Sequence, residues 1–349
     1  MGTQYYDSTI LLEKKDIDGL EPSIYMITTN RSAGKTTDLL IKSLKLFKHL
    51  KRKTILIYRH QYELSSASTI YTSVLQMYPE LGKETTTMKQ AEGLYVEIFL
   101  DGESMGYAVS LNNVDAIKKY SGVFSEVDIC IMDEFQLENG KYLKNEVEKL
   151  QSLAITIARG GGKQSRPIKI FLLGNDVSML NPYFIFFDVS RRKKVGTKYI
   201  RGHGWIAEFL FNESASNAIK ANGIYRAFSN SAYMEYSTNG QKLYNEDEFM
   251  EKSSGKLKYL FTIKHNNKMW GVREELQSGK VFITEHFDQS SKNILTFSSG
   301  EHSTNTVMLS KSSFISKRIK DSYQLGLLRF SNLNAKNVIY DILALDFTK

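Results

Sequence analysis

Apolar residues in the first two thirds of the chain follow two alternating patterns. Four runs are apolar at consecutive positions, as strands buried on both faces of a mostly parallel sheet are; they span residues 24–29, 54–59, 128–133 and 168–174. Between them, residues 36–50 and 145–157 repeat their apolar side chains at helical spacing. This alternation predicts an α/β domain.

The pattern also predicts where this domain ends. Residues 94–111 hold two β-like stretches around Asp101 and Gly102, which predicts a hairpin, and residues 205–211 form the last strand candidate. Residues 212–248 are rich in Asn, Ser and Tyr without sustained periodicity. We therefore predict a domain over 1–211, a small linker module over 212–249 and a second domain over 250–349.

The second domain has an α+β pattern. Strands are expected at 259–264, 270–274, 280–284 and 294–297, with a turn at Asn266 and Asn267 between the first two. Two helices are expected at 312–328 and 335–345.

Composition excludes several classes of protein. The 349 residues are 42% hydrophobic and 24% charged, as in ordinary globular proteins. No apolar run approaches the roughly 20 residues of a membrane span, and the N-terminal residues lack a signal-peptide pattern. A single cysteine, Cys130, excludes an internal disulfide, and six dispersed histidines show no zinc-ligand spacing. We expect a soluble cytosolic protein with no membrane partner.

The basic excess is concentrated in one part of the chain. The net charge is +8, and residues 250–349 hold 15 basic against 9 acidic side chains, a balance of +6. This distribution suits a polyanionic partner such as nucleic acid, although a solvated surface explains it equally well.

The first motif with a specific chemistry follows the first predicted strand. It reads Thr29-Asn30-Arg31-Ser32-Ala33-Gly34-Lys35-Thr36-Thr37 and leads into a helix. This is the context of a phosphate-binding loop, whose backbone N–H groups cradle phosphates. Lys35 is expected to reach the β- and γ-phosphates of ATP, and the Thr36 hydroxyl to ligate Mg²⁺. Thr29 departs from the common pattern, which has Gly at this place.

Two carboxylates end the third predicted core strand. Asp133 is placed to hold Mg²⁺, and Glu134 to orient and deprotonate the attacking water. Parallel strands deliver these groups to the sheet edge that carries the phosphate loop. The pair therefore predicts ATP hydrolysis and not nucleotide binding alone. Cys130, among apolar neighbours, is expected to be a core residue and not a nucleophile.

Asn175 ends the next predicted strand, within Gly174-Asn175-Asp176. It is a candidate sensor that hydrogen-bonds the water and the γ-phosphate. The alternative is an ordinary Gly-Asn turn that leaves the strand.

With these motifs in place, the sequence resembles the packaging ATPases of tailed bacteriophages, and most specifically the DNA-encapsidation ATPases of phi29-like phages. In the wider large-terminase family the loop often lacks the first Gly and carries an Arg four residues before the Lys, as Arg31 does here. The closer family is matched, in the expected order, by Asp133-Glu134-Phe135, the run from Asn175 through Asn181-Pro182-Tyr183-Phe184 to Phe187, Gly271-Val272, Ser291-Lys292-Asn293 and Gly326-Leu327-Leu328-Arg329-Phe330.

The resemblance implies a ring-forming motor, expected to be a pentamer, at the portal of a procapsid in the host cytoplasm. It would drive double-stranded DNA inward with ATP, and some relatives also use a packaging RNA. It further implies a P-loop ATPase domain of the class with a catalytic Glu beside the Mg-binding Asp, a linker and a degenerate, ribonuclease-H-like nuclease domain. The basic clusters 48–53 and 191–194 are candidate DNA or portal contacts, although such clusters are more often solvated surface.

Arg159 precedes three glycines at the end of the helix predicted after the catalytic strand. A guanidinium there is a candidate finger that enters the site of a neighbouring subunit, with Arg31 as the within-subunit cation. The matching position in phi29-like motors resembles such a finger. The alternative is a cation that caps the helix C-terminus. Lys118 and Lys119 are the next candidates.

We predict that the C-terminal domain does not cut DNA. The expected first acidic ligand is replaced by Phe261-Thr262-Ile263-Lys264-His265, and Glu274, Glu275, Glu285 and Asp288 are dispersed. Two other functions stay open: a ring helicase or protein remodeller with the same ATP site, and a non-enzymatic nucleic-acid-binding protein with a relic site.

Overall fold

The computed structural model describes residues 5–159, 164–179, 181–193, 196–229, 231–239, 249–265, 267–290, 294–309, 313–332, 334–336 and 338–339. The chain forms two compact units, residues 1–244 and 245–349, and each is described by itself.

A mostly parallel sheet forms the centre of the first unit. In its described part, nine strands lie in the order β3-β4-β5-β2-β6-β7-β1-β9-β8. The six strands from β5 to β9 in this order are parallel to one another, and the antiparallel pairs are at the two edges. The strands are β1 (Ile24–Thr29), β2 (Lys53–Tyr58), β3 (Thr85–Gln90), β4 (Tyr95–Leu100), β5 (Glu103–Ser110), β6 (Val127–Met132), β7 (Lys169–Asn175), β8 (Tyr199–Gly202) and β9 (Trp205–Leu210). The predicted α/β class is confirmed.

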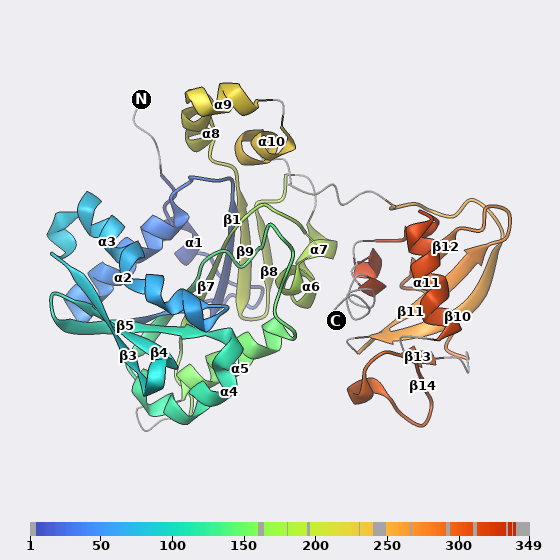
Figure 1. Ribbon diagram of the computed structural model, residues 1–349, viewed down its shortest axis with the longest axis horizontal. Coiled ribbons are helices and arrows are strands. Elements are labelled where there is room, and N and C mark those ends of the chain that lie inside the picture. Colours follow the sequence, from blue (N-terminus) through green and yellow to red (C-terminus); the bar gives the residue numbers. More distant parts are fainter. Residues whose placement is uncertain are drawn as a thin grey trace. The chain divides into compact units, whose positions relative to one another are not determined.

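The helices around this sheet form two groups: α2 with α3, and α4, α5, α6 and α7 in a chain of contacts (Figure 1). Helix α2 contacts both α3 and strand β2, and α5 contacts α4 and α6. Helices α2, α3 and α5 each bury one apolar face. The helices are α1 (Thr9–Leu12), α2 (Lys35–Leu50), α3 (Ala67–Met77), α4 (Val114–Ile117), α5 (Glu146–Ala158), α6 (Pro182–Phe186) and α7 (Val189–Arg192). The main cluster of the core includes Tyr25, Ile27, Leu44, Tyr71 and Phe171, all at most 2% exposed.

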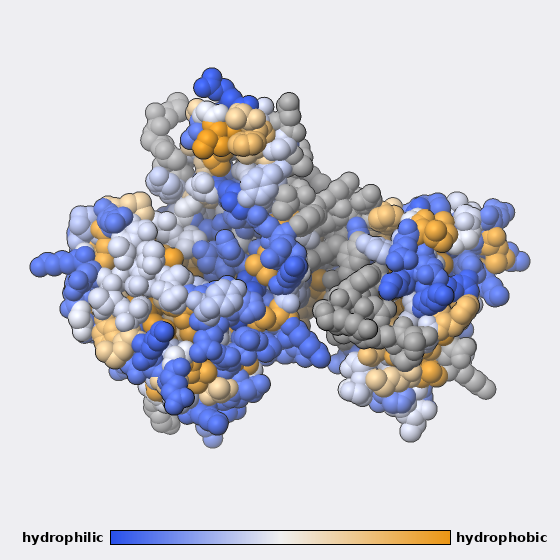
Figure 2. Space-filling model, in the orientation of Figure 1, coloured by the Kyte–Doolittle hydropathy of each residue, from blue (hydrophilic) through white to orange (hydrophobic). Residues whose placement is uncertain are grey.

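The segment after β9 is helical, where its sequence showed no sustained periodicity. It holds α8 (Glu213–Lys220), α9 (Gly223–Phe228) and α10 (Ala232–Asn239), each only 6–8 residues long. Helices of two turns are too short to establish a period in the sequence. Figure 2 shows hydrophobic residues on this segment, and Ile224 and Phe228 are 65% and 61% exposed.

The second unit contains a mixed six-stranded sheet in the order β14-β13-β10-β11-β12-β15. Strands β10, β11 and β12 form an antiparallel meander, and β13 and β14 extend it in parallel beside β10. This mixed sheet with a helix confirms the α+β pattern expected for the second domain. The elements are β10 (Leu257–His265), β11 (Lys268–Glu275), β12 (Val281–Thr284), β13 (Ile294–Thr296), β14 (Val307–Met308), α11 (Phe314–Gln324) and β15 (Leu328–Phe330).

One predicted element of this unit is partly wrong. The helix expected over 312–328 ends at Gln324, because Gly326 adopts a positive φ of 66° and turns the chain into β15. The second predicted helix, 335–345, falls largely outside the described residues, as does the Ser291-Lys292-Asn293 motif.

Candidate active site

The phosphate loop connects β1 to α2 and is shaped by two left-handed residues. Ser32 has φ 59° and Gly34 has φ 90°, and a Cβ at Gly34 would lie 2.9 Å from Tyr5 Cδ1, so glycine is required there. The Tyr6 N–H donates to the Ala33 carbonyl at 2.8 Å, which fixes the loop from outside. Successive left-handed and helical residues of this kind form anion-binding concavities.

The start of the loop is buried. Thr29 is 1% exposed, and its hydroxyl donates to the Asn30 carbonyl at 2.8 Å. The Asn30 side chain donates to the Asn212 carbonyl at 3.1 Å and accepts from the Asn212 N–H at 2.7 Å. The loop is thereby tied to the residue that caps α8. Ser32 is exposed, and Thr37 lies half-buried in the first turn of α2.

Lys35 and Asn175 meet at the ends of two paired strands. Thr29 and Asn175 are register partners in β1 and β7, and Lys35 Nζ donates to Asn175 Oδ1 at 2.8 Å. Burial lowers the pKa of Lys35, and the carboxylates of Asp133 and Glu134 oppose this shift. The predicted phosphate-binding amine therefore contacts the predicted sensor directly.

The two carboxylates follow β6, which pairs with β7 in parallel. The Thr36 hydroxyl donates to Asp133 Oδ2 at 2.8 Å, so the two predicted metal ligands are adjacent. Asp133 Oδ1 accepts the Glu134 N–H at 2.9 Å, and both carboxylates are exposed. Glu134 itself has a left-handed backbone with φ 54°.

Cys130 lies inside the same strand. It is fully buried, and burial raises the pKa of its thiol to about 12. This agrees with the predicted core role, since a thiol of this kind is not nucleophilic at neutral pH.

Arg31 is held by a group that sequence reasoning missed. Its guanidinium pairs with Glu138 and lies 5.1 Å from the centre of the Tyr233 ring. The hydroxyls of Tyr233 and Tyr236 on α10 also donate to Glu138, at 3.4 and 3.3 Å. Burial lowers and the Glu138 hydrogen bond raises the pKa of Arg31, with a net upward shift. An acidic residue four positions after Glu134 was the only available signal.

Arg159 lies apart from these contacts. It follows the last residue of α5 with an extended backbone, and its side chain is exposed. The three glycines after it fall outside the described residues.

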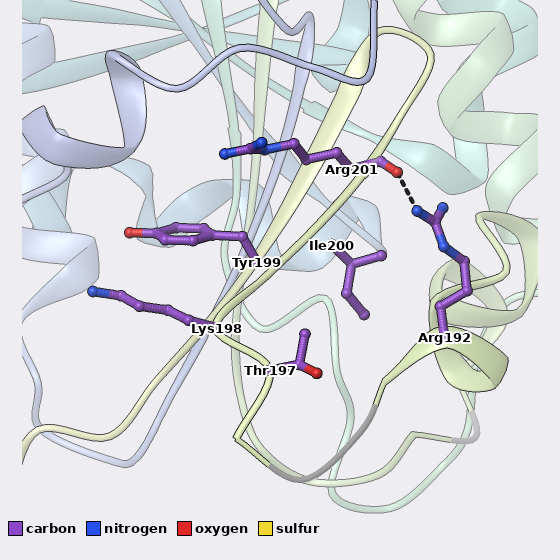
Figure 3. A pocket seen from close by; sticks show the side chains of 6 residues that line it. All are labelled: Arg192, Thr197, Lys198, Tyr199, Ile200 and Arg201. Atoms are coloured by element: carbon purple, nitrogen blue, oxygen red, sulfur yellow. Dashed lines mark hydrogen bonds between the residues drawn. The ribbon is translucent and has the colours of Figure 1, made fainter.

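The basic clusters have mixed surroundings. Lys51, Arg52 and Lys53 pair with Glu103, Asp128 and Glu126 at 2.5, 3.3 and 3.1 Å. In the second cluster, Arg192 helps to line a surface hollow of about 490 Å³ on β8, together with Thr197, Lys198, Tyr199, Ile200 and Arg201 (Figure 3). Arg192 donates there to the Arg201 carbonyl at 2.5 Å, and none of the predicted ATP-site residues lines this hollow.

Glu274, Glu275 and Asp288 of the second unit have local partners. Glu274 pairs with Arg318 at 2.5 Å, and Glu275 accepts from Ser253, Ser278 and the Gly255 N–H. Asp288 accepts from Ser290. Among the described residues, no group of three His, Cys, Asp or Glu side chains is arranged to hold a metal ion. Nor does any described helix have the length and apolarity to cross a membrane.

Comparisons with known proteins identify the family of the chain. The family model for the podovirus DNA encapsidation protein matches residues 3–346. The DNA packaging protein of Bacillus phage phi29 is 25% identical over 320 residues, covering 89% of this chain and 90% of that protein. The fold is similar to a chain of the bacteriophage Phi-29 genome packaging motor assembly (TM-score 0.69, 23% identity, 98% and 99% of the two chains). It is also similar to a Phi-28 DNA packaging motor (TM-score 0.67, 14% identity, 100% and 99%). The chain therefore belongs to the family of podovirus DNA encapsidation proteins.

Proposed function

We propose that this chain binds ATP on the loop 29–37 and uses its hydrolysis to move double-stranded DNA through the portal into a preformed procapsid. The observation that carries the proposal is the meeting of three strand ends. Lys35 lies 2.8 Å from Asn175, and Thr36 lies 2.8 Å from Asp133, with Glu134 next to it.

The residues divide the chemistry among themselves. Lys35 exchanges the Asn175 oxygen for β- and γ-phosphate oxygens, which frees the Asn175 amide to contact the γ-phosphate and the water. Glu134 accepts the proton of the attacking water, because its carboxylate is exposed at the same edge of the sheet.

The donor set also fits a magnesium ion. Thr36 Oγ1 and Asp133 Oδ2 are hard oxygen donors 2.8 Å apart, and Mg²⁺ takes oxygen ligands. Bound there with ATP, Mg²⁺ would neutralise charge that develops on the phosphate oxygens.

Arg159 is proposed as a finger that acts in the neighbouring subunit of a ring, which we expect to be a pentamer. Its exposed position at the end of α5 supports this role, and Arg31 is the within-subunit cation. Arg159→Ala subunits should be inactive alone. Mixed with Glu134→Gln subunits they should regain hydrolysis, because one subunit supplies the base and the other the finger. Mixtures that assemble but stay inactive would place the finger in the same subunit or elsewhere, with Lys118 or Lys119 next.

The remaining assignments follow the family. We propose that 1–211 is the ATPase domain, 212–249 a linker module and 250–349 an inactive nuclease-like domain that docks on nucleic acid or portal. The motor would act in the host cytoplasm at the procapsid portal, with a packaging RNA as a further candidate partner.

ATP turnover by the purified full chain, alone, with duplex DNA and with DNA plus procapsids, tests the proposal. We expect strong stimulation by the full assembly. Lys35→Ala should weaken ATP binding, whereas Glu134→Gln should leave ATP bound and unhydrolysed. Wild-type turnover in both variants would refute the site, and stimulation by single strands with strand displacement would favour the helicase alternative.

A further inference from the structure

An arginine outside the predicted motifs, Arg59, forms hydrogen bonds to the backbone of the loop that carries the proposed catalytic base, Glu134. Arg59 directly follows β2, the strand next to β6, and its side chain is only 7% exposed. One guanidinium nitrogen donates to the Glu134 carbonyl at 2.9 Å, and another donates to the Phe135 carbonyl at 3.0 Å. Two consecutive carbonyls of the catalytic loop are thus held by one planar group.

The backbone at this place needs such support. Glu134 has φ 54°, a left-handed conformation that costs free energy in a residue with a side chain and persists only where its surroundings impose it. The Phe135 N–H donates to the Leu173 carbonyl at 2.9 Å, which anchors the next residue. With its backbone held on both sides, Glu134 presents an exposed carboxylate from a fixed base.

Arg59 is itself oriented by a buried carboxylate. Glu146, the first residue of α5, has a side chain that is 0% exposed; it accepts a hydrogen bond from Arg59 Nε at 3.1 Å and forms an ion pair with Arg59 Nη2 at 2.9 Å. The Tyr183 hydroxyl donates to Glu146 at 2.8 Å, and the Leu143 N–H donates to it at 2.8 Å. Burial and then the Glu146 charge raise the pKa of Tyr183 well above its usual value, so the hydroxyl remains a donor.

We propose that Arg59, oriented by Glu146, is a positioning residue for ATP hydrolysis that holds the Glu134 backbone so that its carboxylate faces the attacking water. The inference rests on the proposed role of Glu134. Helix α5 would then carry a proposed functional residue at each end: Glu146, which orients Arg59, at its first position, and the finger candidate Arg159 directly after its last residue.

A double variant separates positioning from simple stabilisation. Arg59→Met alone leaves the Glu146 charge buried and unpaired, so it is expected to lower the melting temperature. Adding Glu146→Gln removes that charge; the amide oxygen can accept from the Leu143 N–H, and the amide NH2 can donate to the Tyr183 hydroxyl oxygen. The melting temperature should then recover, whereas kcat of the full chain should stay about 10²-fold below wild type, since misplacement of a catalytic group by about 1 Å has this effect. KM and the affinity for a non-hydrolysable ATP analogue should change less than about twofold.

A matched control exists in the second unit. Arg329 also donates to two carbonyls, of Gly326 and Leu328, and to a carboxylate, that of Glu251. Arg329→Met with Glu251→Gln makes a comparable chemical change in the other unit, at residues that do not belong to the proposed ATP site, and kcat should stay at the wild-type value.

Arg59→Lys is the second test variant, because lysine keeps a charge beside Glu146 but lacks the fork that reaches two carbonyls. Its kcat should fall with nucleotide affinity retained. Wild-type kcat in Arg59→Lys or in the double variant overturns the inference. A loss of kcat that always parallels a loss of melting temperature and affinity overturns it as well. Glu134→Gln, measured alongside, keeps the two ideas distinct: if it turns over ATP normally, the proposed function of Glu134 fails.

Discussion

Alanine in place of Gly174 tests how closely the catalytic loop is packed on β7. A Cβ at this position would lie 2.9 Å from Phe135 Cε1, 3.0 Å from Phe135 Cδ1 and 3.1 Å from Gln136 Cγ. An ordinary carbon contact is about 3.5–4.0 Å, so the Phe135 ring would have to move by roughly 0.6–1.1 Å. The ring is fully buried and packs edge-on against Tyr183 and Phe184 at 5.5 Å, which leaves it little room.

The expected size of the effect follows from this packing. Overpacking of a core by one carbon costs about 1–3 kcal/mol of the free energy of unfolding. For a unit of this size, that corresponds to a fall in melting temperature of about 2–12 °C. Because Phe135 adjoins Glu134, kcat should fall as well, by up to about 10²-fold.

Thermal unfolding and ATP turnover of the full chain check both numbers. Gly122→Ala is the matched control, because a Cβ there meets no atom within 4 Å, and its stability should change by less than about 0.5 kcal/mol. In a Phe135→Leu background the further cost of Gly174→Ala should shrink, since the clashing ring is gone. Wild-type melting temperature and kcat in Gly174→Ala, or an equal cost in both backgrounds, would refute the reasoning.

Three further outcomes are expected. Asn30→Ala should lower the free energy of unfolding by about 1–3 kcal/mol in urea titrations, because it removes both hydrogen bonds between the Asn30 side chain and the Asn212 backbone; an unchanged midpoint would show that water replaces these bonds. Cys130 should resist a thiol reagent in the folded protein even at pH 9, because it is buried and burial raises its pKa to about 12, so that little thiolate is present at pH 9; full labelling without unfolding would contradict this. The full chain with Mn²⁺ should leave plasmid DNA uncut, and cleavage abolished by removal of Glu285 or Asp288 would show that a metal site assembles there.

The sequence alone determined the elements with strong patterns and the motifs at their ends. Consecutive apolar runs correctly predicted β1, β2, β6 and β7 to within about two residues, because strands buried on both faces have no polar alternation. The hairpin around Asp101 and Gly102 also followed from local turn chemistry. The sequence did not predict the short elements with weak patterns, such as α9 and the edge strands β3 and β8.

The order of the strands in the sheet brings the separate sequence motifs together into one site. A phosphate loop and an Asp-Glu pair about a hundred residues apart are separate motifs until β1, β7 and β6 lie side by side and bring Lys35, Asn175 and Asp133 to one edge. The roles of Arg59, Glu138 and Glu146 had no sequence signature, because each depends on a partner distant in the chain. Local secondary structure depends on neighbouring residues and can be predicted from them. The side chains that support the Glu134 loop are distant in the chain, and only tertiary packing brings them together.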